Sequence, residues 1–179
     1  LIVPGFHMGQ GVDHEPDGQP NLQALGDDLN LIYPGIPYLP GDEDGVTFLT
    51  PLIIGQVAKV QVTASAPGVL NAWIDFDGDK IWTMGPPEQI SIDMPLVAGV
   101  NVFAFTVSGG TVEPTYARFR FSTQQGLTPD GPAPDGEVED YVVELQEPGN
   151  PSWTKLVNGE PWVGDIPITV ETSKTVTIV

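Results

Sequence analysis

The stretch VLNAWIDFDGD, residues 69–79, joins a strand pattern to an acidic turn and is the most informative part of the chain. Its first half alternates, so that Leu70, Ala72 and Ile74 lie on one side of an extended strand, opposite Asn71 and Trp73. Its second half, DFDGD, places carboxylates at alternate positions around a glycine. The stretch therefore predicts a β-strand that ends in a sharp, carboxylate-rich turn.

The same period of two recurs along the middle of the chain, beginning at Val46. Alternating segments occupy residues 57–65, 99–107, 115–122 and about 138–145, and no segment carries a convincing helical stripe. Glycine and proline number 21 and 19, which suits many short strands joined by turns. The sequence therefore predicts an all-β fold, an antiparallel β-sandwich of the jelly-roll or immunoglobulin-like kind.

The N-terminal region departs from this pattern. Residues 1–45 are rich in glycine, proline and aspartate and show little periodicity, which predicts a long acidic loop region. A structureless loop of that length is unusual inside a compact domain unless something orders it. Bound metal is the ordering agent that we expect, and the predicted sandwich domain covers residues 1–146.

The C-terminal region is predicted to be a separate, short β extension. A linker rich in proline and glycine covers residues 147–151, and the extension covers residues 152–179. The dipeptide Asn158-Gly159 between apolar segments predicts a hairpin turn, and further strands are expected near 166–171 and 174–179. Such a segment is too small to form a core alone, so it is either part of a larger module or a strand donated to another copy.

The charge balance excludes several classes of partner. The chain has 24 acidic and 6 basic residues, a net charge of −18, which phosphates of nucleic acids and anionic membrane surfaces would repel. No segment approaches the roughly 18 apolar residues of a membrane span, so we expect neither nucleic-acid binding nor membrane insertion. The absence of cysteine excludes disulfides and thiolate zinc sites.

Of the 24 acids, 15 fall in five short segments, and this clustering favours bound cations over dispersed surface charge. Calcium takes about six to eight oxygen ligands from carboxylates and carbonyls. The DFDGD turn resembles the start of a helix–loop–helix calcium loop, but its twelfth position is Pro86 and its flanks are strands, so only the ligand chemistry is retained. The predicted calcium ligands are Asp13, Glu15, Asp17, Asp27, Asp28, Asp42, Asp44, Asp75, Asp77, Asp79, Glu88, Asp135, Glu137, Glu139 and Asp140.

Each acidic region also has a simpler interpretation. The DFDGD turn and the N-terminal acids are alternatively solvated loops, and residues 135–141 are alternatively a charged strand edge that resists aggregation. A third possibility for the last region is an arginine partner. Arg118 and Arg120 share one face of a strand, and we expect one of them to pair with Glu137 or Glu139.

The sequence contains few of the residue patterns that are typical of enzymes. The acids occur in runs rather than as two isolated carboxylates, and the two histidines, His7 and His14, both lie in the irregular leader. No Ser-His-Asp order, nucleophile elbow or phosphate loop is present. We therefore expect a non-enzymatic protein. Four tryptophans, which are candidates for a sugar-binding platform, keep a carbohydrate-binding or adhesin module as the alternative; they are Trp73, Trp82, Trp153 and Trp162.

Several motifs together resemble the GEVED domain of bacterial extracellular proteins. The closest is DGEVEDY at 135–141, and LNAWIDFDGD at 70–79 and YARFRFS at 116–122 agree in order and spacing. DGQP at 17–20 and DEDGV at 42–46 extend the resemblance upstream. Two departures are Lys80, where the family usually has a small or acidic residue, and a start that lacks the family's upstream strand.

The resemblance implies an extracellular or cell-surface β-sandwich module that binds calcium and has no catalytic role. Residues 152–179 resemble the opening strands of the repeat modules that commonly follow this domain. The partners it implies are neighbouring modules of the same polypeptide or further copies of the chain, with glycans as another possibility. In the second case, head-to-tail strand complementation by Ile166–Val179 would build a filament.

Overall fold

The computed structural model describes residues 5–10, 44–111, 113–149, 156–157 and 160–161. The chain divides into two compact units, Leu1–Gly149 and Asn150–Val179. Two sets of predictions lie outside the described residues. One is the predicted strands near 166–171 and 174–179. The other is the predicted calcium ligands of the leader: Asp13, Glu15, Asp17, Asp27, Asp28 and Asp42.

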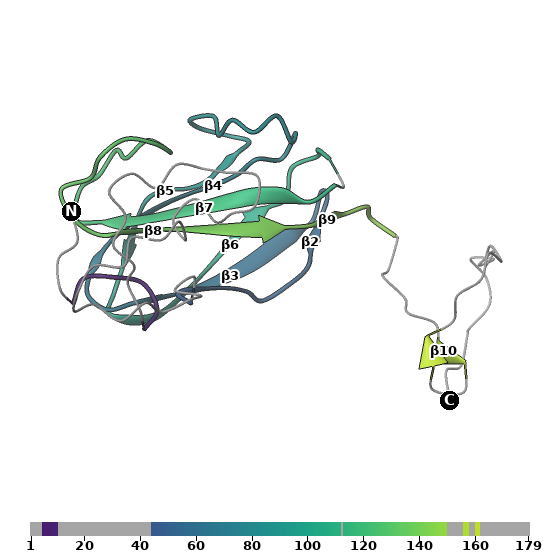
Figure 1. Cartoon of the computed structure of the whole chain (residues 1–179), viewed down its shortest axis with the longest axis horizontal. Coiled ribbons are helices and arrows are strands. Elements are labelled where there is room, and N and C mark those ends of the chain that lie inside the picture. The colour runs from purple at the N-terminus through teal and green to yellow at the C-terminus, as the bar shows by residue number, and fades with distance from the viewer. Residues whose placement is uncertain (1–4, 11–43, 112, 150–155, 158–159, 162–179) are drawn as a thin grey trace, which may run out of the picture. The chain divides into compact units, whose positions relative to one another are not determined.

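The described part of the first unit consists of strands and connecting loops, with no helix (Figure 1). In chain order the strands are β1 (Val46–Phe48), β2 (Leu52–Ile53), β3 (Val57–Ala64), β4 (Gly68–Ile74), β5 (Gln89–Leu96), β6 (Gly99–Thr106), β7 (Thr115–Ser122), β8 (Glu137–Val143) and β9 (Leu145–Gln146). No helix in the described residues is long and apolar enough to cross a membrane.

Two antiparallel sheets form the sandwich, as the alternation predicted. One has the strand order β1-β3-β6 and the other has the order β5-β4-β7-β8 (Figure 1). A short parallel pair, β2 with β9, joins the start of the domain to its end. The predicted all-β antiparallel sandwich is therefore confirmed.

One hydrophobic core unites both sheets. The inward positions of β3 are the small and β-branched residues whose alternation predicted this face, and they are almost completely buried: Ala58, Val60, Val62 and Ala64. From the other sheet come the buried positions Leu70, Ala72, Ile74, Ala117, Phe119 and Phe121. Burial of this apolar surface is the main stabilising contribution to the fold.

The four-stranded sheet is also buried on its outer face, where its residues are polar or aromatic. Asn71, Trp73 and Ser122 are fully buried, and Arg118 and Arg120 are 2% and 4% exposed. Two long loops, residues 75–88 and 123–136, contribute contacts to Arg118, Arg120 and Ser122, whereas Asn71 forms hydrogen bonds with Gln89 and Asp93 of β5. The sheet therefore has an apolar side and a polar side, and the polar side carries the sequence motifs.

Strand β5 was not predicted from the sequence. It lies at the edge of its sheet and pairs with β4 through an irregular register, with shifts between Leu70 and Ala72 and between Ala72 and Trp73. Asp93 adopts a positive φ of 46°, and Pro95 cannot donate a hydrogen bond. These irregularities interrupt the period of two, which is why no strand was expected there.

The second unit contains a small hairpin. Strands β10 (Leu156–Val157) and β11 (Glu160–Pro161) pair antiparallel, with Val157 opposite Glu160. The two residues between them are Asn158 and Gly159, the dipeptide from which the hairpin was predicted.

Candidate metal centre

The loop between β4 and β5 starts at Asp75, whose main chain is held by β7. The Asp75 amide donates to the Tyr116 carbonyl at 2.9 Å, and the Thr115 hydroxyl donates to the Asp75 carbonyl at 2.6 Å. At the other end, the Ile74 amide donates to the Glu88 carbonyl at 2.9 Å. Both ends of the loop are therefore fixed to the sheet, and the first and last of its fourteen residues, Asp75 and Glu88, lie close together.

The Asp75 carboxylate organises the turn from inside. One oxygen, Oδ1, accepts hydrogen bonds from the amides of Gly78 and Asp79 at 2.8 and 3.2 Å. The other, Oδ2, accepts one from the Lys80 amide at 2.9 Å. This wrapping requires left-handed backbone at Gly78 and Lys80, with φ of 74° and 71°, and the glycine of the motif supplies it without strain at the first position.

Three carboxylates converge in this loop. Single oxygens of Asp75, Asp77 and Glu88 lie within 4.8 Å of one another. Asp75 and Glu88 are 2% and 4% exposed, whereas Asp77 is exposed to solvent. The position of Glu88 is fixed by Thr83, whose amide and hydroxyl donate to Glu88 Oε2 at 2.6 and 2.7 Å. The Glu88 carboxylate thus lies beside the start of the loop.

The buried anion at Asp75 is electrostatically unfavourable without a counter-charge. Burial raises the pKa of the Asp75 carboxyl, and the adjacent Asp77 carboxylate raises it further, although the amide hydrogen bonds of Lys80 and Gly78 act in the opposite direction. A hard divalent cation between the three carboxylates would remove this repulsion. The all-oxygen donor set suits calcium, which also accepts the carbonyl and water ligands that a loop can add.

Asp79, the third acid of the motif, has a different role from its neighbours. Its Oδ1 accepts a hydrogen bond from the Ile81 amide at 2.7 Å, and it does not belong to the cluster of three converging carboxylates. The Lys80 side chain is exposed, so the loop uses its amide rather than its charge. Calcium ligation by Asp79 and its neighbours stays a prediction.

Among the described residues, the acids of residues 135–140 have different hydrogen-bond partners, and calcium ligation by these acids stays a prediction. Asp135 accepts hydrogen bonds from the Ser122 hydroxyl and from the Thr123 amide. Glu137 accepts from the Met8 amide at 2.6 Å, and Glu139 accepts from the Gly45 amide at 3.1 Å.

Glu137 and Glu139 lie on the side of β8 that faces the core, because their cross-strand neighbours on β7 are Phe121 and Phe119. The predicted pairing of Arg118 or Arg120 with these glutamates is therefore wrong. The register instead places Asp140 opposite Arg118. The sequence prediction had therefore misassigned the cross-strand partner of Arg118.

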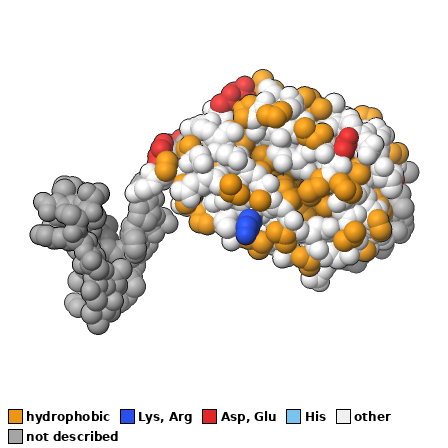
Figure 2. Space-filling model, turned by 180° about the vertical axis from the view of Figure 1, so that it is seen from behind, with side chains coloured by type: hydrophobic (Ala, Val, Ile, Leu, Met, Phe, Trp, Pro, Cys, Tyr) orange, Lys and Arg blue, Asp and Glu red, His pale blue; other side chains and the backbone are white. Residues whose placement is uncertain are grey.

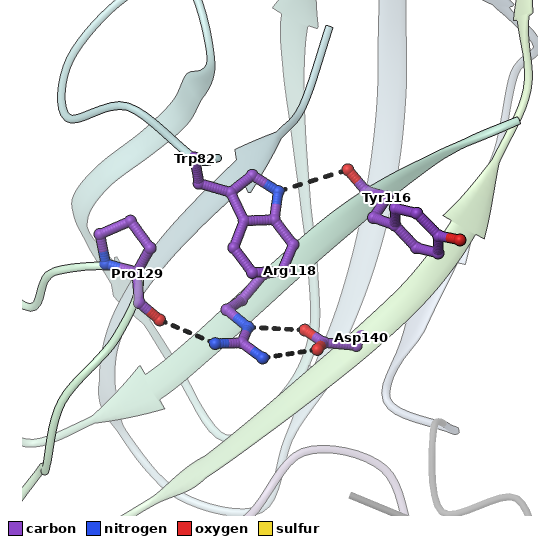
Figure 3. Close-up of polar contacts among 5 residues, drawn as sticks. All are labelled: Trp82, Tyr116, Arg118, Pro129 and Asp140. Carbon is purple, nitrogen blue, oxygen red and sulfur yellow. Dashed lines mark hydrogen bonds and ion pairs between the residues drawn. The ribbon is translucent and has the colours of Figure 1, made fainter. Parts of the chain in front are cut away.

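Arg118 and Asp140 form a buried ion pair (Figure 3). Arg118 Nε and Nη2 donate to the two Asp140 oxygens at 2.7 and 2.6 Å, the bidentate geometry that arginine favours. The guanidinium carbon lies 4.5 Å from the centroid of the Trp82 ring, and the Trp82 indole donates to the Tyr116 carbonyl at 3.4 Å. Trp82 belongs to the acidic loop, so this ion pair also holds that loop against the sheet.

The two arginines together bind four successive carbonyls of the loop before β8. Arg118 Nη1 donates to the Pro129 carbonyl at 3.0 Å, and Arg120 donates to the carbonyls of Thr128, Asp130 and Gly131 at 2.6–2.9 Å. Burial lowers the pKa of the Arg120 guanidinium, and the neighbouring Arg118 lowers it further. The arginines thus act as structural cations that order the loop, an outcome that the loop sequence did not indicate.

Comparison with protein-family models assigns the central segment. Residues 69–144 match the model of the GEVED domain. The similarity to the GEVED domain thus covers 76 of the 179 residues. The searches of the curated proteins and of the solved structures find no significant match.

The matched residues contain β6 and, apart from Gly68, the four-stranded sheet, but not β1 or β3. The core nevertheless depends on β3, whose inward residues are buried against the matched strands. The folding unit is therefore larger than the GEVED match and includes the strands that precede it.

The glutamates of the GEVED run attach the segments that precede β1. Gly45 approaches Glu139 so closely that a Cβ at position 45 would lie 2.8 Å from Glu139 Oε1. Tyr141 donates its hydroxyl to Glu139 Oε2 at 2.9 Å and accepts a hydrogen bond from the Val46 amide at 3.2 Å. Asp44 accepts a hydrogen bond from the Gln10 amide at 2.8 Å, and calcium ligation by Asp44 stays a prediction. The motif thus fastens the beginning of the domain to its end.

Replacing Asp135 with alanine should lower the free energy of unfolding at neutral pH by about 1–2 kcal/mol. Burial alone would raise the pKa of Asp135, but hydrogen bonds from Thr123 and Ser122 outweigh it and hold the pKa below its usual value. A lowered folded-state pKa contributes stability above the unfolded-state pKa, and this contribution disappears as the pH falls through the folded-state value.

The measurement is urea unfolding of the wild type and of Asp135→Ala at neutral pH and at about pH 3. The difference between the two proteins should shrink at the lower pH. A difference of the same size at both pH values would contradict a role for the ionised carboxylate.

Proposed function

We propose that this protein is a non-enzymatic, extracellular structural module of a bacterial surface protein, stabilised by calcium. The observation that carries the proposal is the convergence of Asp75, Asp77 and Glu88 in a loop whose two ends are fixed to the sheet. Extracellular calcium is the hard cation that such an oxygen site accepts. The extracellular location is supported by the family of the domain and by the strongly acidic composition.

Calcium would act on stability rather than on chemistry. The loop that carries the three carboxylates is also the loop that covers Arg118 through Trp82. Neutralising the carboxylates should therefore favour the closed loop and, with it, the buried outer face of the sheet. Because the ion binds the folded state, its binding free energy adds to the free energy of unfolding.

The geometry of the tryptophans favours this function over carbohydrate binding. Trp73 is fully buried, and the Trp82 ring is stacked against the Arg118 guanidinium. A sugar-binding platform needs an exposed aromatic face beside an ion with open coordination positions. Trp73 has no exposed face, and one face of the half-buried Trp82 ring is covered by Arg118. Trp153 and Trp162 lie outside the described residues.

We further propose that the module is a building block that associates with other copies through its C-terminal segment. Donation of an extended segment to the sheet of another copy satisfies main-chain hydrogen bonds and buries apolar side chains. Repeated head-to-tail donation does not close on itself, so it produces a filament rather than a ring or a dimer.

The calcium proposal predicts a large change in thermal stability. At a free calcium concentration of 100 times the dissociation constant, one site should add about 2.7 kcal/mol, which corresponds to a rise in melting temperature of about 5–10 °C. Thermal unfolding monitored by circular dichroism, with calcium and then with excess chelator, measures this rise. Magnesium at the same concentration should produce a much smaller rise, because it needs a tighter octahedral site.

Two substitutions make the test specific. Asp77→Asn alters an exposed side chain of the cluster and should remove most of the calcium-dependent rise without unfolding the domain. Glu144→Gln removes an equally exposed carboxylate outside the cluster and should leave the rise intact. A melting temperature that is insensitive to chelator in the wild type would show that the acidic loop is a solvated turn.

A further inference from the structure

The outer face of the three-stranded sheet is unusual for so acidic a protein. Among the residues of β1, β3 and β6, the one charged residue is Lys59. Large apolar side chains are exposed there instead: Val57, Val100 and Val102 are 61%, 60% and 56% exposed. On the face of the molecule in Figure 2, hydrophobic side chains are widespread and acidic side chains are few.

Strand β6 forms the edge of this sheet. In the strand order β1-β3-β6, the described residues pair β6 on one side alone, with β3. Its eight residues, GVNVFAFT, contain no charge and no proline, and β6 has no bulge in its pairing with β3. Phe103 points toward the core from this edge and is only partly buried. Natural proteins usually protect an edge of this length with lysine, proline or a bulge.

An uncharged edge strand with a regular backbone and no proline is suited to accept one more strand. The segment that best fits this description within the chain is Ile166–Val179, IPITVETSKTVTIV. Ten of its fourteen residues are β-branched, and its single glutamate and single lysine give it no net charge, whereas the chain carries −18. A neutral strand meets no repulsion at the neutral β6 edge.

We propose that β6 is the acceptor edge for the segment Ile166–Val179 of a second copy of this chain. The proposal rests on the head-to-tail assembly proposed above and names its binding site. The alternating residues Val176 and Ile178 would extend the core beyond Phe103, while Thr175 and Thr177 would continue the outer face. The donor is taken to be a second copy because the assembly proposed above joins copies through this segment.

The first test compares two valine-to-glutamate substitutions on exposed strand positions. Val102→Glu on β6 and Val142→Glu on β8 alter side chains that are 56% and 53% exposed, so neither should affect folding, which circular dichroism verifies. Sedimentation velocity over a range of concentrations should show assembly of the wild type and of Val142→Glu, and loss of assembly for Val102→Glu. Equal assembly of both variants would overturn the assignment of β6.

The second test uses the absence of cysteine from the chain. Full-length Val102→Cys and Thr177→Cys proteins are mixed and treated with a short bismaleimide cross-linker. A cross-linked pair between the two variants is expected, and a Val142→Cys control should give little product with Thr177→Cys. Cross-linking of Val102→Cys mainly to itself would instead show that two β6 edges pair with each other, and would overturn the proposal.

The outcomes separate this proposal from those on which it rests. A wild-type chain that stays monomeric at every concentration would contradict both the assembly proposal and the assignment of β6 as acceptor edge. The calcium proposal would be unaffected, because the thermal-unfolding experiment tests it separately. A chain that assembles, but without sensitivity to Val102→Glu, would leave assembly standing and exclude β6 as its site.

Discussion

Replacing Asp140 with alanine is expected to lower the free energy of unfolding by about 3–5 kcal/mol, the cost of leaving one member of a buried ion pair without its partner. Arg118 is 2% exposed, so the substitution removes the carboxylate that balances a buried guanidinium. The bidentate contact also aligns the guanidinium beneath Trp82. Its loss should therefore loosen the acidic loop as well as the sheet.

Urea unfolding, monitored by tryptophan fluorescence, measures this loss as a lower midpoint. Asp130→Ala is the matched control, because Asp130 is an exposed acid whose main-chain carbonyl, retained in the variant, is what Arg120 binds. The control should change stability by less than about 1 kcal/mol. Replacing both Arg118 and Asp140 with apolar residues of similar size should restore part of the loss. Equal effects of Asp140→Ala and Asp130→Ala would contradict the role assigned to the ion pair.

The substitution Gly136→Ala is expected to have the second large effect, about 2–4 kcal/mol, at the first residue of the GEVED run. Gly136 has a φ of 96°, a backbone conformation that residues other than glycine rarely adopt. A Cβ at this position would lie 1.8 Å from the Phe121 carbonyl oxygen. The alanine methyl must therefore displace main chain at the junction of β7 and β8, where no flexible side chain can move aside.

Gly126→Ala separates the two causes of this loss. Gly126 also has a positive φ, 70°, but a Cβ there would meet nothing within 4 Å. It should therefore report only the backbone strain, about 1 kcal/mol. Chemical unfolding of both variants gives the comparison, and a loss at Gly136 no larger than that at Gly126 would show that the close approach to Phe121 is relieved at little cost.

The alternation of residue types was sufficient to predict the faces of the regular strands. Ala58, Val60 and Val62 are buried as their spacing indicated, and Glu137 and Asp140 do lie on opposite sides of β8. This succeeded because the side-chain period of a strand is a local property of the backbone. Where the backbone departs from that period, as at Asp93 in β5, the same reasoning missed the strand.

The candidate metal centre was predicted in part for the same reason. The DFDGD turn is formed by neighbouring residues, so its glycine and its carboxylates can be recognised in the sequence. The return of Glu88 to this turn follows from pairing at the ends of β4 and β5, and Trp82 reaches Arg118 only because the loop folds over the outer face. Nothing in the spacing of these residues distinguishes Trp82 from an ordinary core tryptophan.

Local sequence patterns were enough to predict the all-β class, the inward and outward faces of the regular strands, and the acidic turn after β4, since each depends on neighbours a few residues apart. Long-range packing, in contrast, pairs Arg118 with Asp140 rather than with a glutamate, and makes β6 an uncharged edge strand among the residues that the structure describes. Strand order and register depend on packing between segments far apart in the chain. A shift by one residue would exchange every cross-strand partner while leaving each local pattern unchanged.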